Sequence, residues 1–253
     1  MDIDYKNIEF IPVFRQSILN ETKLLCREEY TNFMKLFKVF VDLDEFLASK
    51  CKEKDNSSKQ YFTRLLNIRV KDHFLSAIIL ASQGFIVDAI SLIRSAMEDL
   101  FLILNFYLDN NYFKNWHENK DDFKIKPGKL RNNSRITKED RKLYNMIYKA
   151  LCNIVHPRKN SLGHMVKFHP TVVGKGTEGI IRIKKDIKLI NLSFFIYIHQ
   201  VSKLLKKIYK NKEDMGSLDT IIHNLSKIRS VYDFIENLYE EKEQNNKLKS
   251  NLF

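Results

Sequence analysis

Five polar residues at helical spacing end at a histidine. Their positions differ by three or four residues, which places their side chains on one face of an α-helix: Lys142, Asn145, Lys149, Asn153 and His156. Pro157 follows the histidine and is expected to end the helix. An imidazole titrates near neutral pH, so His156 is the first candidate for a general acid–base. The alternative is that His156 interacts only with the last carbonyl groups of its helix.

Arg94 and Glu98 form a second candidate pair, one helical turn apart in a polar arc of an otherwise apolar segment. A guanidinium group can hold a phosphate or stabilise developing negative charge, and Glu98 could orient it or accept a proton. The alternative is a local ion pair within the helix. An arginine that precedes the glutamate is the less favourable order for such a pair, which weakens the local explanation slightly.

The positive charge of the chain is concentrated in one segment. Residues 120–188 hold 18 Lys and Arg against 6 Asp and Glu, which equals the net charge of +12 of the whole chain. A concentrated basic field attracts polyanions, whereas the alternative is an ordinary solvated surface. If nucleic acid binds, the expected contacts come from the basic segment: Lys142, Asn145, Lys149, Lys159 and Arg141.

Metal and cofactor chemistry receives little support from the sequence. Cys152, His156, His164 and His169 are near one another but include neither a Cys-x-x-Cys pair nor two histidines on one helical face. The run GKGTEG lacks the spacing of a nucleotide-binding loop, and no nucleophile elbow, kinase motif set or dinucleotide fingerprint is present. We therefore expect no metal and no cofactor.

The composition is that of a soluble globular protein, with 44% hydrophobic and 29% charged residues among 253. Three unpaired cysteines argue against a disulfide framework, and the N-terminal MDIDYKNIEF lacks the pattern of a signal peptide. No apolar run approaches the roughly 18 residues that a membrane-spanning helix needs. We expect a cytoplasmic protein that does not associate with membranes.

Apolar periodicity and few helix breakers (7 Gly, 4 Pro) predict a mainly α fold. The fold class is a bundle of about five to seven helices with a small β-hairpin insertion near residues 166–184. Helices are expected at the following ranges: 12–54 as one or two helices, 61–82, 85–109, 112–118, 137–156, 186–209 and 217–240. Gln83-Gly84 is read as a tight turn, and Thr137 with Asp140 as a capping box.

The whole chain, residues 1–253, is expected to form a single helical domain. Its basic segment, 120–188, would comprise a loop, the helix that carries His156 and the hairpin. Residues 241–253 are read as a frayed tail.

Two stretches resemble the HEPN superfamily of bacterial helical proteins: AIILASQGFIVDAISLIRSAMEDL and IYKALCNIVHPR, within roughly residues 70–160. The resemblance implies a small α-bundle, often dimeric, of a kind found among toxins, phage-defence effectors and RNA-processing ribonucleases. It implies metal-free cleavage, with His156 as acid–base, Asn153 as its polar companion, and Arg94 or Arg158 on the phosphate. The superfamily's Arg-to-His spacing is missing before His156; Arg158 and His164 have it, but in a predicted loop.

Two functions follow as hypotheses. The first is a metal-independent endoribonuclease effector that acts on RNA, of the toxin or phage-defence type, with a homodimer as its plausible assembly. The second is a non-catalytic helical module that binds nucleic acid or a partner protein.

Overall fold

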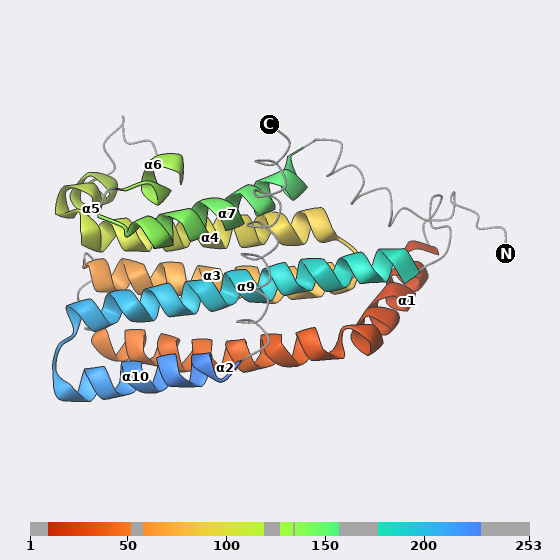
Figure 1. Cartoon of the computed structure of the whole chain (residues 1–253), viewed down its shortest axis with the longest axis horizontal. Coiled ribbons are helices and arrows are strands. Elements are labelled where there is room, and N and C mark those ends of the chain that lie inside the picture. The colour runs from red at the N-terminus through yellow and green to blue at the C-terminus, as the bar shows by residue number, and fades with distance from the viewer. Residues whose placement is uncertain (1–9, 52–57, 119–126, 134, 157–176, 229–253) are drawn as a thin grey trace, which may run out of the picture.

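The structure is a computed structural model that describes residues 10–51, 58–118, 127–133, 135–156 and 177–228. All regular elements in these ranges are helices, which confirms the mainly α fold (Figure 1). They are α1 (Phe10–Leu25), α2 (Arg27–Lys50), α3 (Lys59–Ser82), α4 (Ile86–Leu108), α5 (Asn110–His117), α6 (Pro127–Arg131), α7 (Lys138–Val155), α9 (Thr177–Ile208) and α10 (Lys212–Ser226).

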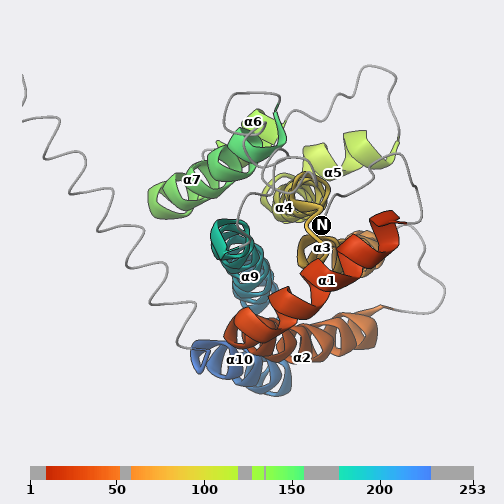
Figure 2. The same ribbon diagram turned by 90° about the vertical axis from the view of Figure 1, so that its right-hand side faces the viewer.

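Helices α3, α4 and α9 form the middle of the bundle. Seen end-on in Figure 2, α7 lies beside α4 on one side, and α2 with α10 lies on the other. The turn between α3 and α4 contains Gly84 at φ 82°, a left-handed conformation that glycine adopts without strain. The predicted turn therefore sets α4 antiparallel against α3, its most extensive neighbour.

Aromatic rings fill the contact between α2, α3 and α9. Phe74 stacks on Phe194 with ring centroids 4.2 Å apart, and Phe194 also meets Phe40 at 5.4 Å. The fully buried Tyr197 donates its hydroxyl to Asn67 Oδ1 at 3.1 Å. Because this polar group is hydrogen-bonded, it can be buried in the core at little cost.

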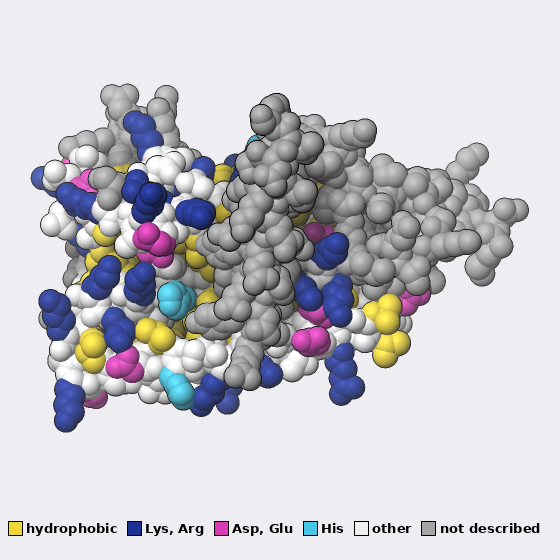
Figure 3. All heavy atoms as spheres, in the orientation of Figure 1, with side chains coloured by type: hydrophobic (Ala, Val, Ile, Leu, Met, Phe, Trp, Pro, Cys, Tyr) yellow, Lys and Arg dark blue, Asp and Glu magenta, His cyan; other side chains and the backbone are white. Residues whose placement is uncertain are grey.

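One face of the molecule is formed by α7, α9 and α10. Figure 3 shows Lys and Arg side chains gathered over the left-hand part of this face, with hydrophobic side chains between them. Exposed lysines of these helices and of the turn after α9 include Lys138, Lys142, Lys207 and Lys210. The basic surface thus extends from the predicted basic segment onto the end of α9.

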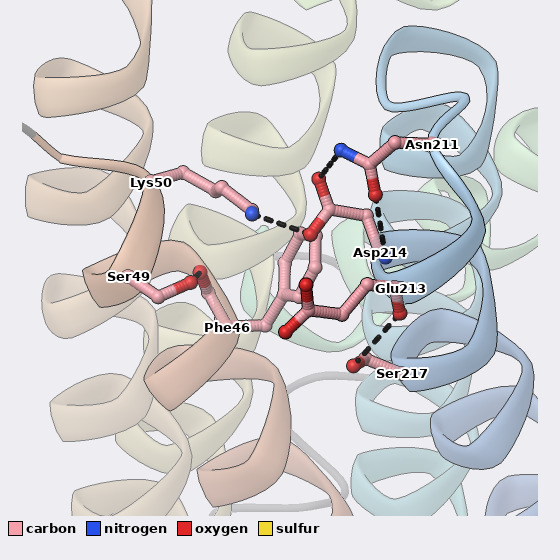
Figure 4. Close-up of polar contacts among 7 residues, drawn as sticks. All are labelled: Phe46, Ser49, Lys50, Asn211, Glu213, Asp214 and Ser217. Carbon is pink, nitrogen blue, oxygen red and sulfur yellow. Dashed lines mark hydrogen bonds and ion pairs between the residues drawn. The ribbon is translucent and has the colours of Figure 1, made fainter.

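Helix α10 is fastened to the end of α2 by a polar cluster (Figure 4). The side chain of Asn211 caps α10 by accepting from Asp214 N–H at 2.8 Å, and its amide donates to Asp214 Oδ2 at 2.7 Å. Lys50 forms an ion pair with Asp214, and its ammonium lies 5.2 Å from the Phe46 ring centroid. These contacts explain the position of α10 without a functional role for Lys50 or Asp214.

Helix α7 has the boundaries that the sequence predicts. Thr137 Oγ1 accepts from Asp140 N–H at 3.1 Å, and His156 occupies the C-cap with extended backbone angles. Short α6 precedes it and is held by Asn105, whose side chain donates to Leu130 O at 3.2 Å. The capping residues thus fix both ends of the helix on which His156 was placed.

Three predictions about elements were wrong in the described residues. The hairpin near 166–184 is not seen: residues 177–184 are the start of α9, and 166–176 lie outside the described residues. The isoleucines suggested a strand, but Ile183, Ile187 and Ile190 are all buried at a helical spacing. Helix α6 lies where a loop was expected, and the described part of the chain holds nine helices rather than five to seven.

Two further predicted ranges extend beyond the residues that the structure describes. Helix α10 stops at Ser226, and the remainder of the expected helix 217–240 is outside the described residues from 229 onward. The expected frayed tail 241–253 also lies there. Among the helices that the structure describes, none has both the length and the hydropathy that crossing a membrane requires.

Candidate functional site

The polar arc of α4, partly exposed to solvent, carries side chains that lie between α3 and α7. Ser91 and Ser95 donate to backbone carbonyls one turn earlier, at 2.8 and 3.2 Å. The consecutive residues Glu98 and Asp99 hydrogen-bond to different neighbours, Glu98 to α7 and Asp99 to α3. Consecutive residues on a helix point about 100° apart, because a turn holds 3.6 residues, so two carboxylates can serve two interfaces.

On the α7 side, Arg94, Glu98 and Tyr148 form a hydrogen-bonded group. Arg94 Nε lies 3.2 Å from Glu98 Oε1 and 3.1 Å from the Tyr148 hydroxyl, which itself donates to Glu98. The side chains of Arg94 and Glu98 are 28% and 30% exposed. The pair is therefore more than a local ion pair within α4, since Tyr148 joins it to another helix.

The electrostatics of this group keep both Arg94 and Tyr148 in their protonated forms. Burial lowers the pKa of Arg94, but Tyr148, Cys152 and Glu98 outweigh it and the pKa is raised. Burial and then the hydrogen bond to Glu98 raise the pKa of Tyr148 to about 12. At neutral pH the hydroxyl is thus a hydrogen-bond donor to the carboxylate and no base.

A second guanidinium stands over the same tyrosine. Arg131 Cζ lies 3.9 Å from the centroid of the Tyr148 ring, and Arg94 Cζ lies 5.4 Å from it, both within cation–π range. Arg131 Nε donates to Asn145 Oδ1 at 3.1 Å, and Asn145 donates to Asn132 at 2.9 Å. Two cations and one carboxylate give this cluster a net positive charge.

On the α3 side, Arg69 holds Asp99 with two hydrogen bonds, Nε to Oδ2 at 2.9 Å and Nη2 to Oδ1. The Asp99 side chain is only 6% exposed, whereas that of Arg69 is 55% exposed. Burial raises the pKa of Asp99, although Arg69 opposes it. His73, one turn after Arg69, is half-buried, and burial lowers its pKa while Asp99 opposes the shift.

Sequence reasoning missed this second group. Arg69 and His73 are four residues apart, a spacing that places them on one face of α3. That spacing was available as a signal. What the sequence did not reveal is that Asp99 of α4 would bind Arg69 and influence the pKa of His73.

The polar stripe of α7 points outward, as predicted. Lys142, Lys149 and His156 are exposed, and Asn145 and Asn153 are half-buried. His156 N–H donates to Cys152 O at 3.0 Å, which closes the last turn of the helix. The imidazole makes no hydrogen bond or ion pair with the other described residues.

The structure brings together only some of the predicted site residues. Phe101 meets Tyr144 and Arg94 meets Tyr148, so α4 and α7 run antiparallel. His156 follows Tyr148 by eight residues, about 12 Å along the helix axis, and shares no described contact with Arg94 or Glu98.

The other predicted residues lie further from this group or beyond the description. Arg141 is half-buried at the start of α7. Arg158, Lys159, His164 and His169 lie outside the described residues. Within the described ranges, no three His, Cys, Asp or Glu side chains are grouped as a metal site would need.

The comparisons with known proteins find no match for this chain. The chain matches no protein-family model, none of the curated proteins and none of the solved structures with which it was compared. The likeness to the HEPN superfamily therefore stays a prediction from two short stretches of sequence.

Proposed function

We propose that this chain binds RNA at the partly exposed polar arc of α4, with Arg94 and Arg131 contacting phosphate groups. The observation that carries the proposal is the pair of guanidinium groups fixed around Tyr148 at the surface. In each, the described hydrogen bonds use Nε. The Nη groups are thereby held in a defined orientation and can donate to a phosphate, as arginine forks commonly do.

The same geometry favours contact with the nucleic-acid backbone over reading of bases. Tyr148 is only 8% exposed and is covered by Arg131, so its ring is not offered for stacking on a base. Contacts to phosphate alone give binding that is insensitive to sequence and strongly dependent on salt. The choice of RNA over DNA rests on the resemblance to the HEPN superfamily.

Fluorescence anisotropy with a labelled single-stranded RNA tests the binding. Arg94→Met and Arg131→Met should each weaken binding about ten-fold or more, because a charged hydrogen bond contributes about 1.5–3 kcal/mol. Each should also lower the slope of log affinity against log salt by about 0.7. Arg27→Met is the matched control, since Arg27 is exposed on α2. Absence of binding, or equal losses in all three variants, contradicts the proposal.

Glu98→Gln separates two roles of the carboxylate. Removal of its charge raises the net charge of the cluster by one, so phosphate binding should tighten a few-fold if Glu98 only orients Arg94. A weaker complex would instead show that the orientation of Arg94 depends on the ionised carboxylate. Single-stranded DNA of the same sequence, measured in parallel, shows whether the site distinguishes the two sugars.

Metal-independent RNA cleavage is the second candidate, and the exposed imidazole of His156 favours it. At the C-cap of α7, this group is accessible and is not engaged by the other described residues. The resemblance implies attack of a ribose 2′-hydroxyl on the adjacent phosphate, for which a histidine can transfer the proton. A toxin or phage-defence role and a homodimer rest on the same resemblance.

Cleavage is tested by incubating labelled RNA with the protein in EDTA. Activity should persist with the chelator and fall by about a hundred-fold or more in His156→Gln, since general acid–base catalysis commonly contributes about 10²–10⁴-fold. His73→Gln is the comparison, because His73 is the half-buried histidine beside Asp99. Activity lost with EDTA, or unchanged in His156→Gln, refutes the assignment while leaving RNA binding intact.

A further inference from the structure

Helix α3 carries apolar side chains on two opposite faces. One face is buried in the core, and the residues of the other face follow a seven-residue repeat: Leu65, Ile68, Asp72, Leu75 and Ile79. Leu65, Asp72 and Ile79 are exposed, and Ile68 and Leu75 are half-buried. A helix that is apolar on all sides is normally buried, and a repeat of this kind is typical of helices that pack along a common seam. The outer face of α3 is therefore expected to meet a partner.

Helix α2 extends this surface, since it lies beside α3 (Figure 2). Its outer residues also recur at intervals of seven: Met34, Val41 and Ala48. Phe40 of α2 and Phe74 of α3 both point towards Phe194 of α9, so the outer residues of the two helices share the side away from α9. Among the described residues, six large hydrophobic side chains are exposed, and all six lie on α1, α2 or α3. We call the outer residues of α2 and α3 the α2–α3 face.

Charged residues flank the α2–α3 face in a self-complementary order. Lys38 precedes Val41 by three residues and Glu45 follows it by four, and both charged side chains are exposed on the same flank. In an antiparallel pair of α2 helices with a two-fold axis at Val41, Lys38 lies beside the partner's Glu45. The same axis sets the large Met34 opposite the small side chain of the partner's Ala48. The face is therefore complementary to itself in charge and in size, as a two-fold interface requires.

The residues of α3 fit the same axis. The hydrogen bond from Asn67 to Asp44 places Asp72 within about 3 Å of the level of this axis along the helices. Leu65 and Ile79 are each seven residues from Asp72, so antiparallel α3 helices set Leu65 against the partner's Ile79. The two Asp72 side chains then meet at the centre, where a polar residue fixes the register of paired helices at a cost in stability.

We propose that the α2–α3 face binds a second copy of this chain, with the helices antiparallel across a two-fold axis. Each of the two helices has 24 residues, which is about 36 Å, and packed helices lie about 10 Å apart. A copy that covers most of both helices contacts roughly 600 Å² on each partner, the lower limit of a stable interface. A dissociation constant on the order of 10 μM is therefore expected. The dimer does not rest on the RNA proposal, because Arg94 and Arg131 lie on other helices.

Sedimentation equilibrium of the full chain, over concentrations that bracket the expected constant, tests the dimer. Val41→Glu and Ile79→Glu add a charge at exposed positions of the face, so the fold should be kept. Each should weaken association about a hundred-fold or more, because the charge loses water or meets its own copy across the axis. Lys207→Glu, at an exposed position of α9, is the control and should leave association unchanged. A wild type that is monomeric at every concentration, an assembly larger than a dimer, or equal association in all variants would overturn the proposal.

A charge exchange tests the antiparallel arrangement. Lys38→Glu and Glu45→Lys each bring like charges together twice across the axis, so each should weaken the dimer about ten-fold. The variant with both changes should regain the affinity of the wild type, because opposite charges meet again. Asp72→Asn should tighten the dimer by about three-fold or more, since it removes two like charges at the centre. A double variant as weak as the single ones, or a dimer weakened by Asp72→Asn, contradicts this arrangement.

Discussion

Removal of Arg69 should destabilise the protein more than removal of the charge on Asp99. The two side chains share a bidentate contact, but Asp99 is 6% exposed and Arg69 is 55% exposed. In Arg69→Met the buried carboxylate loses its partner, which in fully buried pairs costs about 3–5 kcal/mol. Because water reaches the arginine side of the pair, we expect about 2–3 kcal/mol here.

Asp99→Asn has a smaller expected cost. The arginine that is left alone is already half in solvent, and the asparagine oxygen still accepts one of its hydrogen bonds. A loss of about 1 kcal/mol follows, the usual contribution of one hydrogen bond. Combining Arg69→Met with Asp99→Asn should therefore recover part of the stability that Arg69→Met loses, since no charge is then buried.

The stability that Arg69→Met loses should also change with pH in a defined direction. Burial raises the pKa of Asp99 even with Arg69 present, and the loss of Arg69 must raise it further. At pH values between the unfolded and folded pKa of Asp99, the folded state binds one proton that the unfolded state does not bind. The free energy of unfolding therefore falls as pH rises. The deficit of Arg69→Met should thus be smaller at pH 5 than at pH 7.5.

Urea unfolding of the wild type, both single variants and the double variant at these two pH values measures all of this. The slope with denaturant must stay constant for the free energies to be compared. If Asp99→Asn costs as much as Arg69→Met, or if the deficit of Arg69→Met grows on acidification, the account of an unequally buried pair is refuted.

Three further predictions concern other elements of the fold. Tyr148→Phe should lower the free energy of unfolding by about 1 kcal/mol and the melting temperature by about 2–4 °C; an unchanged melting curve would show that the hydroxyl contributes nothing. Asp140 has a lowered pKa, because Thr137, Lys203 and Gln200 outweigh burial, so its stabilisation is present above the unfolded carboxyl pKa and is lost as pH falls. Urea unfolding of Asp140→Asn should therefore show a weaker loss of stability on acidification from pH 6 to 3 than the wild type shows, and parallel curves would contradict this. Gly84→Ala should destabilise by about 1 kcal/mol, since φ is 82° and an alanine is strained there, and a stabilised variant in calorimetry would exclude that conformation.

The elements that could be predicted are those specified by neighbouring residues. The capping pair Thr137 and Asp140, the turn at Gly84 and the proline after His156 act over three or four residues, and the helices they bound are found. The start of α9 was mistaken for a strand because its β-branched residues favour strands on average. Burial of Ile183 and Ile187 against the bundle overrides that preference, and such burial depends on helices far away in the sequence.

The candidate site also combines residues that local spacing predicts with residues that distant parts of the chain contribute. Arg94 and Glu98 could be found because both lie on α4, and the outward stripe of α7 follows from its spacing alone. Tyr148 and Arg131, which complete the first group, come from other helices. Tyr148 packs in the core, while its hydroxyl remains a partner of Arg94.

Glu98 belongs to the group with Arg94 and Tyr148, and Asp99 pairs with Arg69. The two groups are connected because these carboxylates are adjacent in the chain. Because they are neighbours on α4, the charge of Glu98 contributes to the raised pKa of Asp99, after burial. Each carboxylate is balanced by an arginine, Arg94 on one side and Arg69 on the other. Arg131 is left as the cation that no described carboxylate balances. An approaching phosphate would therefore meet Arg131 as its strongest attraction, with Arg94 already oriented beside it, and this places the centre of the proposed contact at Tyr148 and not at His156.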